Sequence, residues 1–468
     1  MKLYQASKRC LVLGASAAFV IGVLSSLAKA TPPSVPAPVP EKIAPAALKK
    51  LFQKEMARSK PDYVVYVPKS LDGSTCDGGN EHFLVFDGPD GSMMAVWTQS
   101  RQEGAGDHIV FSRSTDEGKS WIPPICLVGP TSKEDPTLQA SWAFPMISKS
   151  GRIYIVYNQY QGIIDYNRQV TGTMNCLYSD DCGKTWSKPG TIPMRRSPYD
   201  NPDPKYPSNW IVWQKPIRDL NGYWFTGFTR WVSKAVRVKP HGAPWDNESV
   251  TEFMRFTNLD NNPEPKDIKI EWSAWGNKAL TVGHYTNPRL SVCEEPSLVR
   301  LPDNRLFCTM RTMTGYIWYS VSSDDGHTWF APRPLRQEDL GQLILQPIFG
   351  CPIYQMSDGR YILFHEPEFG GFNPGNSGGL TSNRRPCYVA VGEFRPNAEQ
   401  PIWFSGSKEL MDNDGVGIGP LQRVDIGSYG SFTIRNGTNV LWYPDRKFFL
   451  LGKNITPDFL SGLEVPTE

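Results

Sequence analysis

The side chains best suited to chemistry in this chain are two of its six histidines, His82 and His108, which open the β-rich runs EHFLVF and HIVFSRS. Imidazole changes charge near neutral pH, so a pair of histidines can take up and return a proton. Arg and Tyr side chains recur at corresponding points of later runs, with few acids among them, and such a rim suits an anionic substrate. The candidates for substrate contact are Trp97, Gln99, Tyr157, Tyr166, Arg311, His365, Arg385 and Tyr429.

An octet of the form Ser-x-Asp-x-Gly-x-(Ser/Thr)-Trp occurs three times, over residues 114–121, 179–186 and 322–329. In each copy the Asp carboxylate can accept hydrogen bonds from the backbone of the turn, and Gly supplies a positive φ. The Trp fills the groove between neighbouring sheets. We therefore predict three tight hairpins, with their tryptophans Trp121, Trp186 and Trp329 buried in equivalent positions between sheets.

A second repeat, a Gly or Asn hairpin followed by an apolar run, recurs at Gly91, Gly151, Gly222, Asn304, Gly359 and Gly437. The spacing is that of one four-stranded blade with its loops. The chain is thus predicted to be all-β, with residues 60–468 forming a single β-propeller domain of four-stranded antiparallel blades. Six units are visible. Seven blades are favoured, with the seventh hidden within 222–304 or assembled from the chain ends, and six are the alternative.

The order of strands in a blade predicts where a site should lie. In an antiparallel meander the start of the first strand, the end of the second and the start of the third share one face, and the octets lie on the other. This places His82 and His108 on one face of the first unit, and Glu294, Glu295 and Arg384 on the same face of later units. We expect the site there, where the strands converge on the axis.

The N-terminus has the pattern of a bacterial secretory signal peptide over residues 1–30. Basic residues precede an apolar run that is short for a membrane span, and Ala28-Lys29-Ala30 follows as a cleavage signal. An uncleaved membrane anchor is the less favoured alternative. Residues 31–59 are predicted to be a Pro-rich linker and a short helix with helical periodicity over 41–58. Cleavage near Ala30 would release a secreted or periplasmic protein.

Composition excludes several classes of function. The net charge is +2, which gives no electrostatic support to nucleic-acid binding. No later segment is apolar enough to span a membrane, so no membrane partner is expected, and the protein is expected to be a monomer. Eight cysteines follow the leader without a CxxC or zinc-ribbon spacing, and their pairing is left open.

The octets resemble the Asp boxes, or BNR repeats, of sialidase-like β-propellers. The sialidase family uses an Arg triad for the sialate carboxylate, a Tyr–Glu nucleophile pair and an Asp acid/base. Glu294 or Glu295 and Arg311 resemble the family's Glu and second Arg. The family's first Arg stands in a Phe/Tyr-Arg-Ile-Pro motif at the start of the first blade, where this chain reads Asn80-Glu81-His82-Phe83. The missing guanidinium argues against sialidase activity.

A closer resemblance is to the seven-bladed propellers of uronate-directed polysaccharide enzymes, namely ulvan lyases, rhamnosyl–glucuronate lyases and related rhamnosidases. It rests on Asn80-Glu81-His82, on Asp107-His108 and on Arg168 in the next blade. The resemblance implies β-elimination at a glucuronate of an ulvan-like or arabinogalactan-like polysaccharide, with His82, His108 and Arg168 as catalytic residues. Arg168 would neutralise the carboxylate, and the histidines, backed by Tyr157 or Tyr166, would move the protons.

Two further classes of function stay open. One is an exo-acting glycoside hydrolase, either an α-L-rhamnosidase or an atypical sialidase, and the other is a propeller that binds carbohydrate without catalysis. All three would have an acidic polysaccharide or oligosaccharide as partner. None needs a redox cofactor, and a structural metal ion is left open. Lyase products carry a C4–C5 double bond that absorbs ultraviolet light, whereas hydrolase products do not.

Overall fold

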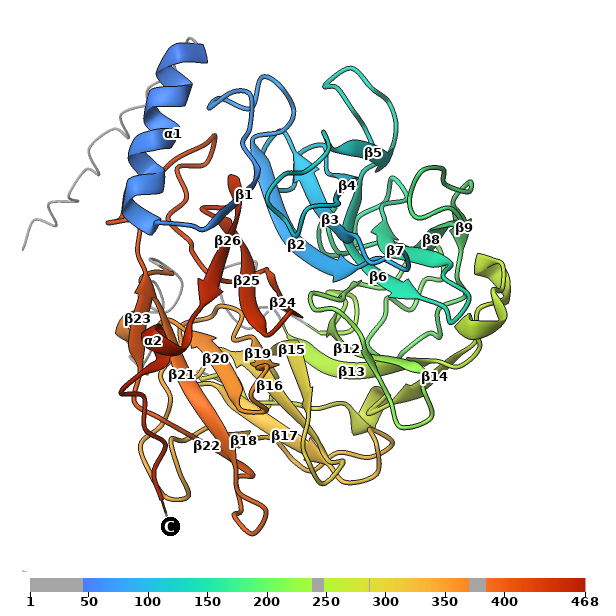
Figure 1. Cartoon of the computed structure of the whole chain (residues 1–468). Helices are drawn as coiled ribbons and strands as arrows, with labels where there is room; N and C mark the ends of the chain where they lie inside the picture. The colour runs from blue at the N-terminus through green and yellow to red at the C-terminus, as the bar shows by residue number, and fades with distance from the viewer. Residues whose placement is uncertain (1–44, 238–247, 286, 370–383, 468) are drawn as a thin grey trace, which may run out of the picture. The chain divides into compact units, whose positions relative to one another are not determined.

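A computed structural model of the chain describes residues 45–237, 248–285, 287–369 and 384–467. Within the unit Pro40–Glu468 the described residues form six antiparallel sheets, which follow one another in chain order around a common axis, from blue to red in Figure 1. Four sheets have four strands in meander order, and two carry one additional short strand. The fold is therefore a β-propeller of four-stranded antiparallel blades, as predicted.

The first two blades are regular meanders. Blade 1 contains β2 (Gly79–Asp87), β3 (Met93–Ser100), β4 (His108–Ser114) and β5 (Ile125–Val128), and blade 2 contains β6 (Ala140–Ile147), β7 (Ile153–Gln159), β8 (Thr173–Ser179) and β9 (Gly190–Thr191). In blade 3 the inner strand is interrupted, so that two short pieces pair with one long strand. Its strands are β10 (Trp210–Ile211), β11 (Ile217–Arg218), β12 (Trp224–Trp231), β13 (Ser249–Phe256) and β14 (Ile270–Ser273).

Blades 4 and 5 continue the pattern, and in blade 5 the outer strand is divided in two. Blade 4 contains β15 (Cys293–Arg300), β16 (Leu306–Thr312), β17 (Trp318–Ser322) and β18 (Arg333–Pro334), and blade 5 contains β19 (Ile353–Gln355), β20 (Tyr361–His365), β21 (Cys387–Phe394), β22 (Ile402–Phe404) and β23 (Lys408–Met411). Single 3₁₀ turns lie in the connections, at η2 (Leu259–Asn261), η3 (Pro265–Asp267), η4 (Gly276–Lys278) and η5 (Pro367–Phe369).

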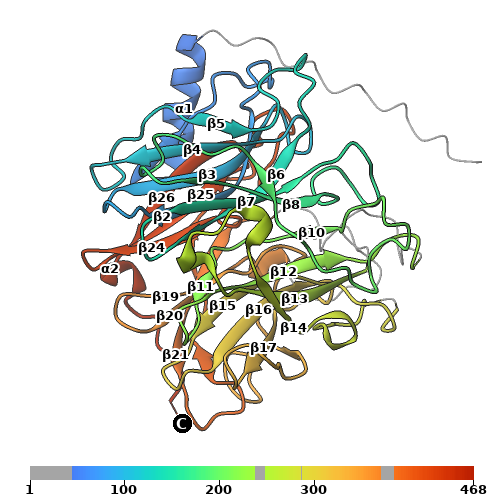
Figure 2. The same cartoon turned by 90° about the vertical axis from the view of Figure 1, so that its right-hand side faces the viewer.

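The last blade is built from both ends of the chain. β24 (Ser431–Arg435), β25 (Thr438–Asp445) and β26 (Phe449–Ile455) are joined at the outer edge by β1 (Tyr63–Tyr66). β2 of blade 1 lies beside β24–β26 in both views (Figures 1 and 2). Pairing of an N-terminal strand with C-terminal strands closes the ring, because it holds the first and last parts of the propeller in one sheet.

Two short helices flank this closing blade. α1 (Pro45–Ser59) confirms the predicted helix and packs on the blade through Phe52, whose ring lies 5.5 Å from that of Phe449. Its Glu55 makes a buried ion pair of 2.8 Å with Arg446. α2 (Pro457–Leu460) is the last helix of the described chain. None of the described helices is long and apolar enough to cross a membrane.

The described residues form six blades, not the favoured seven. In the described part of the interval 222–304, where a seventh was sought, lie the long strands β12 and β13, β14 and turns before β15. The chain ends contribute strands to the sixth sheet instead of forming one of their own. The predicted leader and linker, residues 1–44, lie outside the described residues. The eight described cysteines are free thiols.

The three octets adopt the predicted hairpin. In the second copy, Asp181 accepts hydrogen bonds from the backbone N–H of Thr185 (2.8 Å) and from its hydroxyl (2.6 Å), and Gly183 has a φ of 79°. Each Trp is half-buried against an aromatic ring of the preceding blade. Trp121 lies 5.8 Å from Trp442, Trp186 lies 5.2 Å from Phe111 and Trp329 stacks 4.1 Å from Phe253. The equivalent positions are confirmed, but the burial is only partial.

Replacing Gly183 with alanine is expected to lower the thermal midpoint of unfolding for two reasons. The positive φ costs a non-glycine residue about 1–2 kcal/mol. The new Cβ would also stand 2.6 Å from the ring of Phe111, which adds about 1–3 kcal/mol of overpacking. Gly91→Ala is the matched control, because Gly91 has the same φ of 79° and no atom within 4 Å of the new Cβ. Equal midpoints for the two variants would contradict the packing role of the octet.

Candidate functional site

A cavity of about 320 Å³ opens on the face where first strands begin and second strands end. Every blade except blade 1 contributes residues from the strand ends that the meander grammar assigns to this face, and blade 1 contributes Glu103 from the β3–β4 connection. We call this cavity the central pocket. Its aromatic and charged lining consists of Glu103, Trp142, Tyr166, Trp231, Glu294, Glu295, Arg311, Arg384, Arg423, Tyr429 and Lys447.

The same unusual backbone conformation recurs at equivalent positions around this pocket. His82, Trp142, Glu295 and Tyr429 occupy the same point at the start of the inner strand in blades 1, 2, 4 and 6, and all four have φ between 48° and 61°. In blades 1, 2 and 4 the register of the ladder shifts at this point, which is the signature of a β-bulge. A bulge redirects a side chain out of the strand alternation, and left-handed backbone in bulky residues is a strain that usually serves a site.

Threonine side chains of the preceding blade support two of these strained residues. The hydroxyl of Thr98 accepts a hydrogen bond from the backbone N–H of Trp142 (3.0 Å), and that of Thr229 accepts one from the N–H of Glu295 (2.7 Å). The N–H groups would otherwise be left without a ladder partner at the bulge, and both lie in the buried interior. The inter-blade contacts thus hold Trp142 and Glu295 in place.

Tyr429, Glu295 and Arg311 form a closed triangle of hydrogen bonds at the pocket. The Tyr429 hydroxyl donates to Glu295 Oε1 (3.0 Å), and Arg311 Nη1 donates to the same carboxylate oxygen (2.6 Å) and to the Tyr429 oxygen (2.9 Å). Burial and the neighbouring Glu295 carboxylate raise the pKa of Tyr429, so the phenol is neutral near pH 7. A neutral phenol that donates to a carboxylate can lose its proton to that carboxylate when the oxygen forms a new bond.

A second carboxyl group, Glu294, lies on the other side of Arg311. Its Oε2 is 3.3 Å from Arg311 Nε, and its Oε1 accepts hydrogen bonds from Trp231 Nε1 (3.0 Å) and the Ser249 hydroxyl (2.9 Å). Burial raises the pKa of Glu294 to about 7, against the opposing effect of Arg311. A carboxyl group that titrates near neutral pH is suited to donate a proton.

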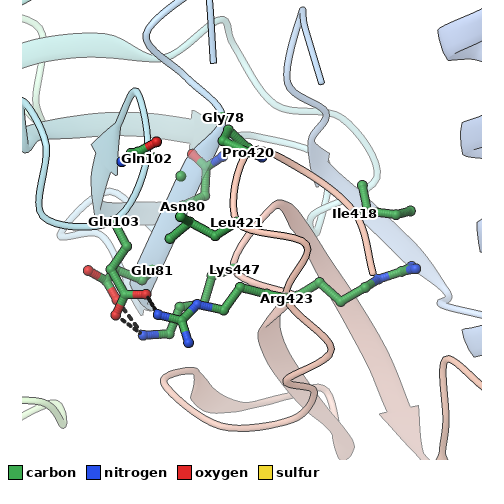
Figure 3. Close-up of a pocket in the computed structure, with 12 residues that line it drawn as sticks. Gly78, Asn80, Glu81, Gln102, Glu103, Ile418, Pro420, Leu421, Arg423 and Lys447 are labelled. Atoms are coloured by element: carbon green, nitrogen blue, oxygen red, sulfur yellow. Dashed lines mark hydrogen bonds and ion pairs between the residues drawn. The ribbon is translucent and has the colours of Figure 1, made fainter. Parts of the chain in front are cut away.

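Lys447 and Arg423 bring positive charge to the blade 1 side of the central pocket. Both also line a neighbouring pocket, drawn in Figure 3, where their charged ends lie beside Glu103. Lys447 Nζ contacts Glu81 Oε2 (2.7 Å) and Glu103 Oε1 (2.6 Å), and it lies 4.6 Å from the centre of the Tyr429 ring. Arg423 pairs with Glu103 as well. Burial raises the pKa of Glu81. A lysine from the last blade thus brings cationic charge to Glu81 at the start of blade 1.

Arg384 is the remaining cation of the central pocket. Its guanidinium lies 4.6 Å from the Phe349 ring and 3.6 Å from Asp425 Oδ2. The neighbouring Arg385, which the sequence analysis selected, makes a paired contact with Asp412 instead (Nε–Oδ1, 2.6 Å). Two adjacent residues ahead of β21 point differently, so Arg384, not Arg385, lines the pocket. The assignment of Arg385 to substrate contact is therefore corrected.

The predicted trio of His82, His108 and Arg168 does not surround one pocket. His82 is fully buried behind the central pocket, with its ring 5.0 Å from that of Trp142, and burial lowers its pKa to about 3. His108 lines a separate groove beside β1, and Arg168 lines a third cavity at the edge of blades 1 and 2. The prediction that the three share a pocket is wrong, because the His82 ring lies in the buried interior and the other two side chains line different cavities.

Among the predicted substrate contacts, Tyr166, Arg311 and Tyr429 line the central pocket. Trp97 and Tyr157 are fully buried in the packed interior of blades 1 and 2, because their strand positions face the neighbouring sheets. Gln99 hydrogen-bonds Asn80 (2.9 Å) and lines the groove of His108. His365 is buried against the Ser407 hydroxyl (2.9 Å). These four have structural partners, and none of them lines the central pocket.

Sequence reasoning selected no role for several pocket residues. Lys447 follows the end of the second strand in the last unit and Trp231 ends the second strand of the third, so the strand grammar contained a signal for both. Trp142 lies at the start of the first strand of the second unit, so the same grammar contained a signal for it, whereas Glu103 and Arg423 had none, since loops place them. Within the described part of the chain, no group of three or more His, Cys, Asp and Glu side chains could hold a metal ion.

The fold is that of a sialidase-like β-propeller. Carboxyl groups, cationic side chains and aromatic rings line its central pocket. The sequence profile of the BNR repeat-like domain matches residues 91–368, more than half of the chain, and the chain belongs to this family. No curated protein matches the sequence.

Several solved structures are similar in fold. A protein of unknown function from Dyadobacter fermentans is 14% identical, with 85% of this chain and 96% of that chain covered and a TM-score of 0.53. An intramolecular trans-sialidase from Ruminococcus gnavus, in complex with oseltamivir carboxylate, is 14% identical, with 88% and 100% covered and a TM-score of 0.54. A sialidase from Streptococcus pneumoniae is 12% identical, with 86% and 71% covered and a TM-score of 0.55. These identities establish the fold alone.

Proposed function

We propose that this protein is a glycoside hydrolase that removes an acidic sugar from a saccharide chain, with Tyr429 and Glu295 as its nucleophile pair. The observation that carries the proposal is the triangle of Tyr429, Glu295 and Arg311 at the central pocket. A phenol has no charge of its own, so it can approach a reacting carbon that bears a carboxylate without repulsion, and tyrosine nucleophiles are known in this kind of glycosidase.

The proposed reaction has two steps. The Tyr429 oxygen attacks the anomeric carbon while its proton passes to Glu295, and the glycosidic bond breaks as the leaving oxygen takes a proton from Glu294. Water then attacks the same carbon, gives its proton to Glu294 and releases the Tyr429 oxygen, which recovers its proton from Glu295. Two displacements retain the anomeric configuration. Arg311, Arg384 and Lys447 supply the charge that binds the sugar carboxylate.

The pH dependence follows from Glu294. A general acid must be protonated, and burial raises the pKa of Glu294 to about 7. The value of kcat/KM is therefore expected to fall as pH rises above about 7, by close to tenfold per pH unit once Glu294 is ionised. The Glu294→Gln variant should lose this alkaline limb and should lose most activity on sugar leaving groups. Aryl glycosides that need no protonation should be affected less. An unchanged alkaline limb in Glu294→Gln would exclude Glu294 as the acid.

The test of the function is a substrate screen with product analysis. Sialosides and uronides are incubated with the protein, together with the same compounds carrying a methyl ester in place of the carboxylate. We expect a released acidic sugar with retained anomeric configuration by NMR, and at least tenfold slower reaction of the esters, since each loses charge-assisted hydrogen bonds. Equal rates for acid and ester, or an inverted product, would contradict the proposal.

The second candidate is β-elimination at a glucuronate, which the sequence resemblance favours. It required His82, His108 and Arg168 at one pocket, and the structure separates them. The same screen decides between the two reactions, because elimination products absorb ultraviolet light. A lyase would lose about 10²-fold or more in rate in His108→Ala, whereas the proposed hydrolase should keep its rate in that variant and lose it in Tyr429→Phe.

A further inference from the structure

A second cavity, of about 250 Å³, lies at the edge of blades 1 and 2, next to the central pocket. It is bounded by the β3–β4 connection, the β7–β8 connection and the segment between β5 and β6. We propose that this cavity binds a second anionic sugar unit, carboxylated or sulfated, of the same saccharide chain. The proposal extends the proposed function from a single acidic sugar to a poly-anionic saccharide, and it rests on that function for the identity of the neighbouring unit.

Charge is the first observation behind this inference. Arg101, Lys133 and Arg168 line the cavity, and none of them forms an ion pair with a described residue. The one carboxylate in the lining, Asp135, is occupied by the backbone N–H groups of Thr131 and Thr137, each at 2.9 Å. Asp135 keeps its negative charge, so three cations and one anion line the cavity, and this excess of positive charge concentrates anionic ligands.

The central pocket differs in this respect. Its cations are paired, Arg311 with Glu295, Lys447 with Glu81 and Glu103, and Arg423 with Glu103. Most arginines elsewhere in the described chain also have a carboxylate partner. Three cations without an ion pair in one cavity thus differ from most cations of the described chain. An anionic ligand could form the ion pairs that these three side chains lack.

The two cavities share a wall, which is the second observation. Along the β7–β8 connection Asn167 and Gln169 line the central pocket, whereas Arg168 between them lines the second cavity. Along the β3–β4 connection Glu103 faces the central pocket, and Ala105 and Gly106 face the second cavity. A saccharide that extends from the central pocket across this wall would meet the cationic cavity with its next units, since adjacent residues of one connection line the two cavities.

The lining of the second cavity also suits a sugar beyond its charge. Tyr160 offers an aromatic ring and a hydroxyl, and Gln139 and Thr137 offer polar groups for sugar hydroxyls. Lys133 and Arg168 are exposed, so water and salt screen the charge of each. Binding of an anionic sugar therefore depends on Arg101, Lys133 and Arg168 acting together. We therefore expect affinity that falls steeply with ionic strength.

Binding is tested by calorimetry with three tetrasaccharides, a galacturonate, a sulfated carrageenan and neutral cellotetraose. The variant Arg101→Gln/Arg168→Gln is compared with Lys119→Gln/Lys184→Gln, which removes the same two charges from exposed octet tips on the opposite face. We expect at least one anionic tetrasaccharide to bind, with about tenfold or greater loss of affinity in Arg101→Gln/Arg168→Gln only. The neutral tetrasaccharide should not bind detectably.

Two outcomes would overturn the proposal. One is equal affinity of the two double variants for every anionic tetrasaccharide, or no binding at all. The other is equal binding of the neutral tetrasaccharide. The Tyr429→Phe protein serves to separate this proposal from the proposed function, because it should bind the anionic tetrasaccharide as the wild type does. Binding by that variant together with a wild type that hydrolyses nothing would remove the hydrolase proposal and leave the anionic site standing.

Discussion

A Tyr429→Phe variant is expected to turn over substrate roughly 10³-fold more slowly than the wild type, because it keeps the ring and loses only the oxygen that is proposed to attack the sugar. The rest of the site should stay in place. The ring packs among Trp142, Trp213 and Phe349, and these contacts do not involve the hydroxyl. The measurement is kcat on the substrate that the screen identifies, with the thermal midpoint as a check on folding.

Tyr157→Phe is the matched control for this prediction. Tyr157 is a fully buried tyrosine in blade 2 that does not line the central pocket. Removal of its hydroxyl should leave kcat unchanged, since it lies away from the proposed reacting groups. Similar rates for Tyr429→Phe and the wild type would exclude Tyr429 as the nucleophile. A rate loss shared by both variants would point to a general effect on the fold.

An Arg311→Met variant is expected to lose about 3–5 kcal/mol of unfolding free energy as well as its activity. Arg311 lies between two buried carboxyl groups, 2.6 Å from Glu295 and 3.3 Å from Glu294. Methionine fills similar space but leaves both groups without a counter-charge in the protein interior. The measurement is denaturant unfolding. Arg168→Met is the control, because Arg168 is exposed and unpaired, and its loss should change stability by less than about 0.5 kcal/mol.

The pH dependence of this loss identifies its cause. Without Arg311, less opposes the burial that raises the pKa of Glu294, so this pKa should lie further above its value of about 4.3 in the unfolded chain. The folded variant then binds more protons than the unfolded chain, so its stability falls as pH rises above about 4 toward the raised pKa. The deficit relative to the wild type should therefore be smaller at pH 5 than at pH 8. A deficit independent of pH would mean that lost packing, not unpaired charge, is the cause.

The octets were readable from the sequence because their interactions are local. Asp181 bonds to Thr185 only four residues away, and the left-handed turn needs a glycine at one fixed place. The repeat of these units identified the propeller and the face of its site, and it correctly placed Arg311, Tyr166 and Tyr429 there. Strand periodicity carries this information because successive side chains alternate and each hairpin reverses the chain.

Only the tertiary structure determined the number of blades and the direction of several pocket side chains, because the order of strands along the chain does not specify them. Blade number depends on how the sheets pack around the axis and on the pairing of β1 with β26, which joins residues from opposite ends of the chain. The bulge at Glu295 and the left-handed backbone at Tyr429 break the alternation, so the direction of these side chains could not be extrapolated along a strand. Arg168 and Gln169 are neighbours in sequence but face different cavities. Contacts between blades set these directions, and such contacts leave no periodic trace in the sequence.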